Sequence, residues 1–219
     1  MDRAAWLRER RRIAEERMDT LFAPVYDDHW GGYINPTHRR MVGRFLALCP
    51  PRARILDAAC GTGKYWPLLS EGGHDLLGID QSAGMLRRAH AKFPAVPTEK
   101  LGLQELARED AFDGVVCIDA LELVFPEDWP RVLANVHRAL RAGGPFYFTV
   151  ELPEEDLPEV FGAAVEAGLP VVEGEYVKEG GYHYYPAIAR VRPWADAAGF
   201  TILEEAAGDG YHHVLARKR

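Results

Sequence analysis

A glycine-rich turn and one carboxylate carry the strongest chemical signal in the sequence. Gly61 and Gly63 lie in ILDAACGTGKY, residues 55–65, where an apolar run meets small residues. Glycines at such a turn let the backbone bend sharply and let a ligand approach closely. Asp80 ends the next apolar run, where a carboxylate can accept hydrogen bonds from both hydroxyls of a ribose. The pattern predicts a nucleoside-binding site.

The same turn lacks the signatures of a phosphate cradle. A dinucleotide site requires G-x-G-x-x-G, but Trp66 stands at the position of the third glycine. A phosphate-binding loop requires G-x-x-x-x-G-K-S/T, and Ala58 and Tyr65 occupy its first and last positions. Asp80 would also repel a 2′-phosphate, which disfavours NADP-like ligands. The residues therefore favour a nucleoside ligand without phosphate, such as S-adenosylmethionine.

Four segments resemble, in order, the motifs of the Rossmann-like class I S-adenosylmethionine-dependent methyltransferases. They are LDAACGTG at 56–63, LLGIDQSAGML at 76–86, FDGVVCIDALELV at 112–124 and LRAGGPFYFT at 140–149. The resemblance implies S-adenosylmethionine as cofactor and methyl transfer to an O, N or C nucleophile of a small molecule.

The resemblance also implies roles for individual residues. It places the glycine turn, with Ala59, at the amino-acid part of the cofactor and Asp80 at the ribose. Asp57 is interpreted as organising the turn and the ammonium end of the cofactor. The remaining residues of the expected cofactor site are Gln81 and Met85 beside the adenine, Leu103 and Gln104 along its edge, Cys117 and Ile118 beside the sulfonium, and Tyr26 as an aromatic side chain that closes over the cofactor.

Three positions depart from the family pattern. Ala59 stands where glycine is frequent, a change expected to cost little because alanine is small. GLQE at 102–105 replaces an acidic residue that often contacts the adenine amino group, so this contact falls to Gln104 or is absent. Leu123 stands where histidine is frequent, so no catalytic base is assigned.

Candidate residues for the methyl acceptor lie outside these motifs. EGEYVKEGGYHYYP, residues 173–186, predicts a hairpin that turns at 178–181 and places His183 and Tyr185 on one face. The hairpin either lines the acceptor pocket or serves packing or a dimer contact. The other acceptor-side candidates are Tyr33, His38 and Glu151.

Two alternatives to methyl transfer remain at this point. One is a non-catalytic S-adenosylmethionine-binding sensor or partner subunit. The other is an aminopropyl-type transferase that uses the decarboxylated cofactor. Such enzymes usually add acidic residues for a polyamine substrate, and the sequence offers Glu122 and Glu151 without an obvious acidic cluster.

The elements that position these residues form a strand–helix alternation from residue 53 onward. It predicts a single α/β domain over 1–219 with a Rossmann-like, mostly parallel seven-stranded sheet and helices on both faces. The short link AGDG between the last two strands makes the C-terminal strand antiparallel. The expected parts are a helical cap at 1–50, a cofactor-binding core at 51–151, a substrate-side insertion at 152–186, and a helix with two strands at 187–219.

Several local signals set the expected helix boundaries. Helices are predicted over 3–22, 37–48 and 187–199, and a shorter one over 63–73. Ser82 and Asp128 are the expected N-caps of two further helices. Residues 23–38 are interpreted as a loop.

Composition narrows the partners. The chain has 219 residues, 47% of them hydrophobic, and a net charge of −7, so nucleic acid is not expected as a partner. The basic run RERRR at 8–12 is followed by acidic residues and is interpreted as a solvated helix face. Three cysteines without a CxxC pattern indicate neither a disulfide framework nor a metal site. With no apolar targeting or membrane-spanning stretch in the sequence, we expect a cytoplasmic monomer or homodimer.

Overall fold

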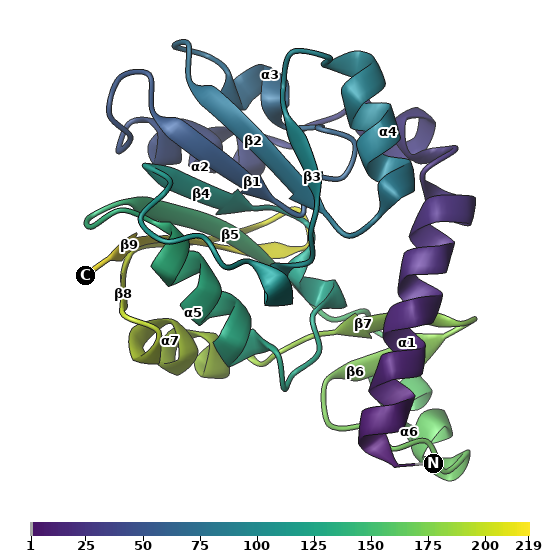
Figure 1. Cartoon of the computed structure of the whole chain (residues 1–219). Helices are drawn as coiled ribbons and strands as arrows, with labels where there is room; N and C mark the ends of the chain where they lie inside the picture. Colours follow the sequence, from purple (N-terminus) through teal and green to yellow (C-terminus); the bar gives the residue numbers. More distant parts are fainter. Residues whose placement is uncertain (1) are drawn as a thin grey trace.

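The alternation of strands and helices folds into a mixed seven-stranded sheet. The computed structural model describes residues 2–219, and its strands follow the order β3-β2-β1-β4-β5-β9-β8 (Figure 1). β1 to β5 pair in parallel, whereas β9 runs antiparallel between β5 and β8. The predicted Rossmann-like fold is thus confirmed. The strands are β1 Arg54–Ala58, β2 Asp75–Asp80, β3 Thr98–Lys100, β4 Gly114–Cys117, β5 Pro145–Glu151, β8 Phe200–Gly208 and β9 Tyr211–Lys218.

Both faces of the sheet are covered by helices, because side chains alternate along each strand and both sets are apolar. Leu56 and Val115 pack in a core with α5 and α7, whereas Ile55 and Val116 pack in a second core with α2, α3 and α4. The helices are α2 Pro36–Leu46, α3 Trp66–Leu69, α4 Ala83–Lys92, α5 Trp129–Ala139 and α7 Ile188–Ala197. The prediction of helices on both faces is confirmed.

The N-terminal segment forms a helical cap. α1 Arg3–Arg17 continues into the π-helical turn η1 Met18–Phe22, which confirms the helix predicted over 3–22. A second π-helical turn, η2 Asp27–Gly31, occupies part of the segment interpreted as a loop. In Figure 1, α1 stands across the end of the sheet where the parallel strands finish.

The insertion between β5 and α7 contains one element that the sequence analysis missed. The predicted hairpin is present as β6 Glu175–Lys178 and β7 Gly181–Tyr184, with the turn where it was expected. Before it lies α6 Leu157–Glu166, which has a proline in its first turn and buries only Ala164. The sequence analysis assigned no helix to this stretch, in which a proline and a glycine interrupt the apolar residues. The hairpin lies beside α1 (Figure 1), and Trp6 contacts Tyr182 edge-to-face at 6.1 Å.

Of the two predicted N-caps, one makes the expected capping hydrogen bond and the other does not. Ser82 accepts a hydrogen bond from the Met85 backbone N–H at 3.1 Å and is the N-cap of α4, as predicted. Asp128 is at the N-cap position of α5, but its side chain makes no capping bond and instead accepts one from Arg11 at 2.7 Å. The helix predicted over 63–73 shrinks to the single turn of α3.

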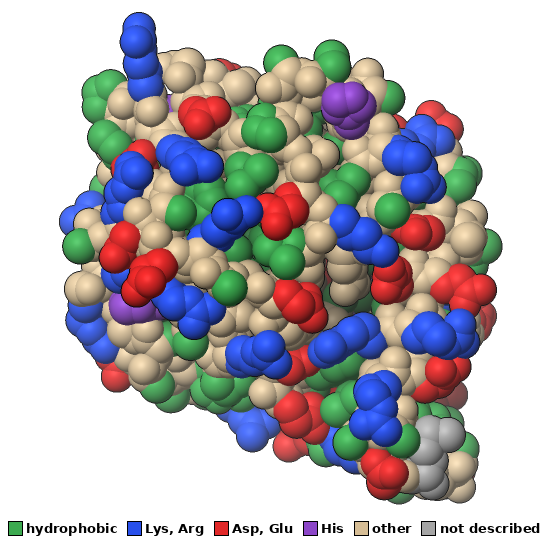
Figure 2. Space-filling view, in the orientation of Figure 1, with side chains coloured by type: hydrophobic (Ala, Val, Ile, Leu, Met, Phe, Trp, Pro, Cys, Tyr) green, Lys and Arg blue, Asp and Glu red, His purple; other side chains and the backbone are tan. Residues whose placement is uncertain are grey.

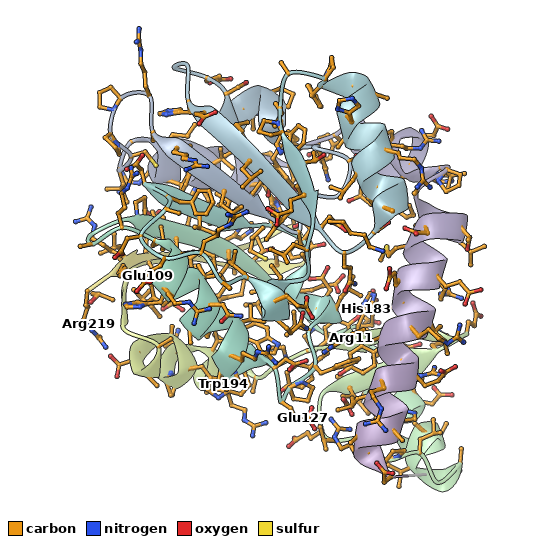
Figure 3. The ribbon with its side chains drawn as sticks, in the orientation of Figure 1. Arg11, Glu109, Glu127, His183, Trp194 and Arg219 are labelled. Atoms are coloured by element: carbon orange, nitrogen blue, oxygen red, sulfur yellow. The ribbon has the colours of Figure 1, made fainter. Side chains whose placement is uncertain are left out.

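Three arginines of α1, namely Arg3, Arg11 and Arg12, form ion pairs with acidic side chains. Arg12 contacts Glu9 and Glu16 within the helix. In Figure 3, Arg11 points from α1 toward the body of the domain, where it meets Asp128. Figure 2 shows Lys and Arg interspersed with Asp and Glu over this face. In addition, none of the helices over residues 2–219 has the length and apolar character needed to cross a membrane.

Candidate cofactor and acceptor site

A pocket opens at the carboxyl ends of β1, β2 and β4 and is covered by Met18 and Tyr26 from the cap. This is the edge at which open α/β sheets bind ligands. Ten residues of the predicted cofactor site line it: Tyr26, Asp57, Ala59, Gly61, Asp80, Gln81, Met85, Leu103, Gln104 and Ile118. Cys117 lies in the buried core instead, and Gly63 packs closely against the ring of Trp66. The sequence analysis did not single out Met18, Cys60, Lys64, Leu101, Gly102, Asp119, Ala120 and Val124, which also line the pocket, and it named Tyr65 and Leu123 without a role there.

The turn after β1 adopts the backbone that glycine favours. Ala59, Gly61 and Gly63 all have positive φ, at 66°, 53° and 75°. A Cβ on Gly61 would meet no atom of the described chain within 4 Å, so this position is open to a ligand, whereas a Cβ on Gly63 would lie 2.7 Å from the Trp66 ring. The departure at Ala59 therefore matters through its left-handed backbone, which costs a non-glycine residue about 1–2 kcal/mol, and the small size of alanine is secondary.

Asp80 ties the turn to the end of β2. Its Oδ2 accepts a hydrogen bond from the Gly61 N–H at 2.9 Å, and its Oδ1 accepts one from the Ser82 N–H at 2.8 Å. Burial raises the pKa of the Asp80 carboxyl, while these two N–H groups oppose the increase. A carboxylate offers about four lone-pair sites. Asp80 can thus fix the turn and still accept hydroxyl hydrogen bonds from the pocket.

Asp57 lies at the floor of the pocket and is only 2% exposed. Its carboxylate accepts a hydrogen bond from Trp66 Nε1 at 2.9 Å. Burial raises the pKa of Asp57 to about 7, and the charges of Asp80 and Asp119 add to this increase. The carboxyl group is therefore only partly ionised at neutral pH and would ionise fully beside a cationic group of a ligand.

Asp119, at the end of β4, is a pocket residue that the sequence analysis did not name. Its carboxylate accepts a hydrogen bond from Tyr65 Oη at 2.6 Å and lies 2.7 Å from His38 Nε2. Burial opposes its ionisation, but the contacts with His38 and Tyr65 hold the pKa of Asp119 below its usual range. An aspartate that directly follows the apolar run GVVCI was the available signal.

The acceptor-side candidates divide into three groups. His183 Nδ1 lies 2.9 Å from Tyr185 Oη in a hydrogen bond and 3.1 Å from Glu151 Oε2, so these three residues come together. His38 is fully buried and does not line the pocket itself, but it contacts the pocket residues Asp119 and Tyr65. Tyr33 is 68% exposed and is not among the pocket-lining residues of the described chain.

Comparison with known proteins gives this geometry a family. A profile described as "Methyltransferase domain" matches residues 55–144. A solved S-adenosylmethionine-dependent methyltransferase of Mesorhizobium loti is 25% identical, with a TM-score of 0.65 over 80% of this chain and 96% of that one. Residues 55–144 form a methyltransferase domain of the class I S-adenosylmethionine-dependent type, and the cofactor of this domain is S-adenosylmethionine.

Two further proteins show the extent of the likeness. The methyltransferase is 32% identical over 143 residues to YqeM of Bacillus subtilis, named as a methyltransferase, covering 59% of this chain and 53% of that protein. Magnesium protoporphyrin IX methyltransferase of Synechocystis, solved with S-adenosylhomocysteine, is 18% identical with a TM-score of 0.69 over 96% of this chain and all of that one, which shows a shared fold. The chain spans about half the length of the curated relatives it matches.

Proposed function

We propose that this methyltransferase transfers the methyl group of S-adenosylmethionine to a small acceptor that enters between the cap and the hairpin. One observation carries the proposal: the covered pocket holds the open glycine turn together with Asp57 and Asp80 at one end. Asp119 and Leu123 line the same pocket, and the short helix η4 Leu121–Leu123 packs against β5 and β7, where Glu151 and His183 meet. A nucleoside half and an acceptor half are thus adjacent.

The chain's own residues have mainly positioning work to do. When bound, the cofactor supplies a methyl group already activated by its sulfonium. Asp80 would orient the ribose, Asp57 would pair with the ammonium group, and Met18 and Tyr26 would cover the bound molecule. Positioning of this kind can lower a barrier by several kcal/mol, up to roughly 7–11 kcal/mol, and a covered site keeps water away from the reacting atoms.

The names of relatives support a small acceptor. One relative is named trans-aconitate 2-methyltransferase, from Deinococcus radiodurans, and others are named malonyl-acyl-carrier-protein O-methyltransferases. A relative from Shewanella amazonensis is named for a modification of tRNA. The net charge of −7 and the mixed charges over the face in Figure 2 do not favour a polyanion for this chain.

Calorimetry tests the nucleoside half of the proposal. We expect S-adenosylhomocysteine to bind with a dissociation constant on the order of micromolar and NAD not to bind, because no diphosphate cradle accompanies Asp80. Release of S-adenosylhomocysteine on addition of S-adenosylmethionine and a cell extract, but not without the extract, would show transfer to an acceptor. Tight NAD binding without a response to S-adenosylhomocysteine would refute the proposal.

The pKa of Asp57 predicts how the affinity depends on pH. Because the pKa is raised to about 7, lowering the pH below 7 protonates the carboxylate that would pair with the ligand ammonium. Affinity for S-adenosylhomocysteine should then fall by up to about tenfold per pH unit. Titration calorimetry from about pH 8 to about pH 5.5 measures this loss.

A matched ligand isolates the contribution of Asp57. 5′-Methylthioadenosine shares the adenine and ribose but lacks the ammonium and carboxylate groups, so its affinity should change less over the same range. Asp57→Asn should remove the difference between the two ligands. An identical pH dependence for both ligands in the wild-type protein would rule out the pairing of Asp57 with the ammonium group.

A further inference from the structure

Two glutamates lie on neighbouring elements beside the pocket. Glu122 belongs to the short helix η4 Leu121–Leu123, whose Leu123 lines the pocket, and Glu151 ends β5, against which η4 packs. Glu122 is only 8% exposed, and its Oε2 has no hydrogen-bond partner anywhere in residues 2–219. Oε2 of Glu151 is likewise buried and has no aligned hydrogen bond within the described chain, although His183 is close. Buried polar groups of this kind are normally paired, so the arrangement is incomplete without a further molecule.

The charge around this pair is unbalanced. Burial raises the pKa of Glu122 well above its usual range, and the charge of Glu151 raises it further. Among the described residues, no lysine or arginine makes an ion pair with either glutamate, and His183 is the one basic side chain in contact. The ammonium of Lys64 lies 3.9 Å from Asp119, which is also paired with His38. The ion pairs of the described residues thus leave the two glutamates with His183 alone as a basic partner.

Three tyrosines lie within electrostatic range of the pair. Burial raises the pKa values of Tyr26, Tyr185 and Tyr211, and the charge of Glu122 adds to each increase. Tyr26 lines the cofactor pocket, and Tyr211 is paired in register with Glu151 across β9 and β5. Tyr185 is hydrogen-bonded to His183, which contacts Glu151. The two glutamates thus lie near both the pocket wall and the hairpin.

We propose that the methyl acceptor carries a protonated amine that docks between Glu122 and Glu151, with tyrosine rings around it. An ammonium group has three donors and no acceptor, and charge-assisted bonds to carboxylates are the strong ones. Aromatic faces attract the same cation. The inference rests on the proposed function, since it names the class of acceptor for the same site.

A panel of matched ligands tests the proposal. With the protein saturated in S-adenosylhomocysteine, calorimetry compares 2-phenylethylamine, tyramine and putrescine with alcohols and carboxylates of the same skeletons. At least one amine should bind about tenfold or more tightly than its alcohol, and its carboxylate should be weaker still. Release of S-adenosylhomocysteine from S-adenosylmethionine, measured with each compound, shows which of them are also methylated.

Isosteric variants tie the selectivity to the pair. Glu122→Gln and Glu151→Gln should each lower the affinity for the bound amine by about tenfold or more and keep S-adenosylhomocysteine affinity within about threefold. Glu155→Gln changes an exposed residue of the insertion between β5 and α7. It should alter neither the affinity for the amine nor the affinity for S-adenosylhomocysteine. If Glu122→Gln fails to fold, the half-buried Glu151 carries the comparison.

The outcomes separate the two proposals. Any of three results would overturn the amine inference. They are tighter binding of an alcohol or a carboxylate than of its amine, an amine affinity that is unchanged in both variants, and no binding of any amine at about 10 mM. If the wild-type protein still binds S-adenosylhomocysteine in these cases, the proposed function remains supported. Loss of S-adenosylhomocysteine binding by the wild-type protein would instead contradict the proposed function itself.

Discussion

Asp80→Ala should lower the affinity for S-adenosylhomocysteine by about a hundredfold or more in a protein that still folds. The change would remove the two charge-assisted hydrogen bonds that we propose between Asp80 and the ribose, each worth roughly 1.5–3 kcal/mol. It also releases the Gly61 N–H, which Asp80 holds at 2.9 Å, so the glycine turn loses part of its support. Calorimetric titration of the variant measures the loss.

Ser82→Ala is the matched control for this experiment. Ser82 caps α4 and accepts the Met85 N–H, so its loss should reduce stability by about 0.5–2 kcal/mol but leave the ribose contact in place. Asp80→Asn keeps the shape and one acceptor oxygen and should lie between wild type and Asp80→Ala. An affinity within about threefold of wild type in a folded Asp80→Ala protein would show that Asp80 serves only the turn.

Arg3→Met should lower the free energy of unfolding by about 2–4 kcal/mol, more than Ser82→Ala or Arg12→Met. Arg3 donates to both carboxylate oxygens of Glu175 at 2.9 Å and also pairs with Glu127. The side chain of Glu175 is fully buried, so the variant leaves a buried charge without its cation. Glu175 keeps hydrogen bonds from Tyr182 and the Val172 N–H, and Arg3 is itself 22% exposed, which moderates the loss. Urea unfolding measures it.

Two variants control for a general effect of removing an arginine. Arg12→Met removes an exposed arginine of the same helix with two ion pairs and should cost less than about 1 kcal/mol. Arg3→Met combined with Glu175→Gln removes both charges and should recover part of the loss. If Arg3→Met and Arg12→Met had equal effects, the buried contact between α1 and the hairpin would be energetically unimportant.

The sequence predicted best the features that depend on neighbours in the chain. The turn at Gly61 and the acid at Asp80 form a local strand–turn–helix pattern, so their joint position could be inferred from spacing. The helices on both faces of the sheet followed from the alternation of strand and helix signals along the chain. The hairpin turn followed from glycines between two runs of strand-forming residues.

The features that were missed depend on contacts between distant segments. Asp119 becomes a pocket residue held by His38 because the fold joins positions 81 residues apart. The pair of Arg3 and Glu175 joins positions 172 residues apart. His38, Arg3 and Glu175 carry no local motif, and the position of Asp119 after the run GVVCI does not indicate its partner. Only the assembled cap, sheet and hairpin therefore reveal these contacts.

The cap has a kinetic consequence. The first turn of α1 is fastened to the hairpin through Arg3, while Asp19 in η1 accepts hydrogen bonds from Ser82 and the Gly84 N–H of α4. Met18 lies next to Asp19 in the chain, Tyr26 lies next to Asp27, which accepts a hydrogen bond from Thr62, and both side chains line the pocket. We therefore expect a bound molecule to leave only when this bridge lifts.

We therefore expect the residence time of S-adenosylhomocysteine to depend on this N-terminal bridge, residues 3–27, as well as on the contacts inside the pocket. Lys100 with Glu15 and Lys92 with Asp27 join the bridge to the domain through partly exposed ion pairs, and added salt screens such pairs. Ionic strength thereby becomes a control on how fast the product leaves, while the groups that recognise it stay unchanged.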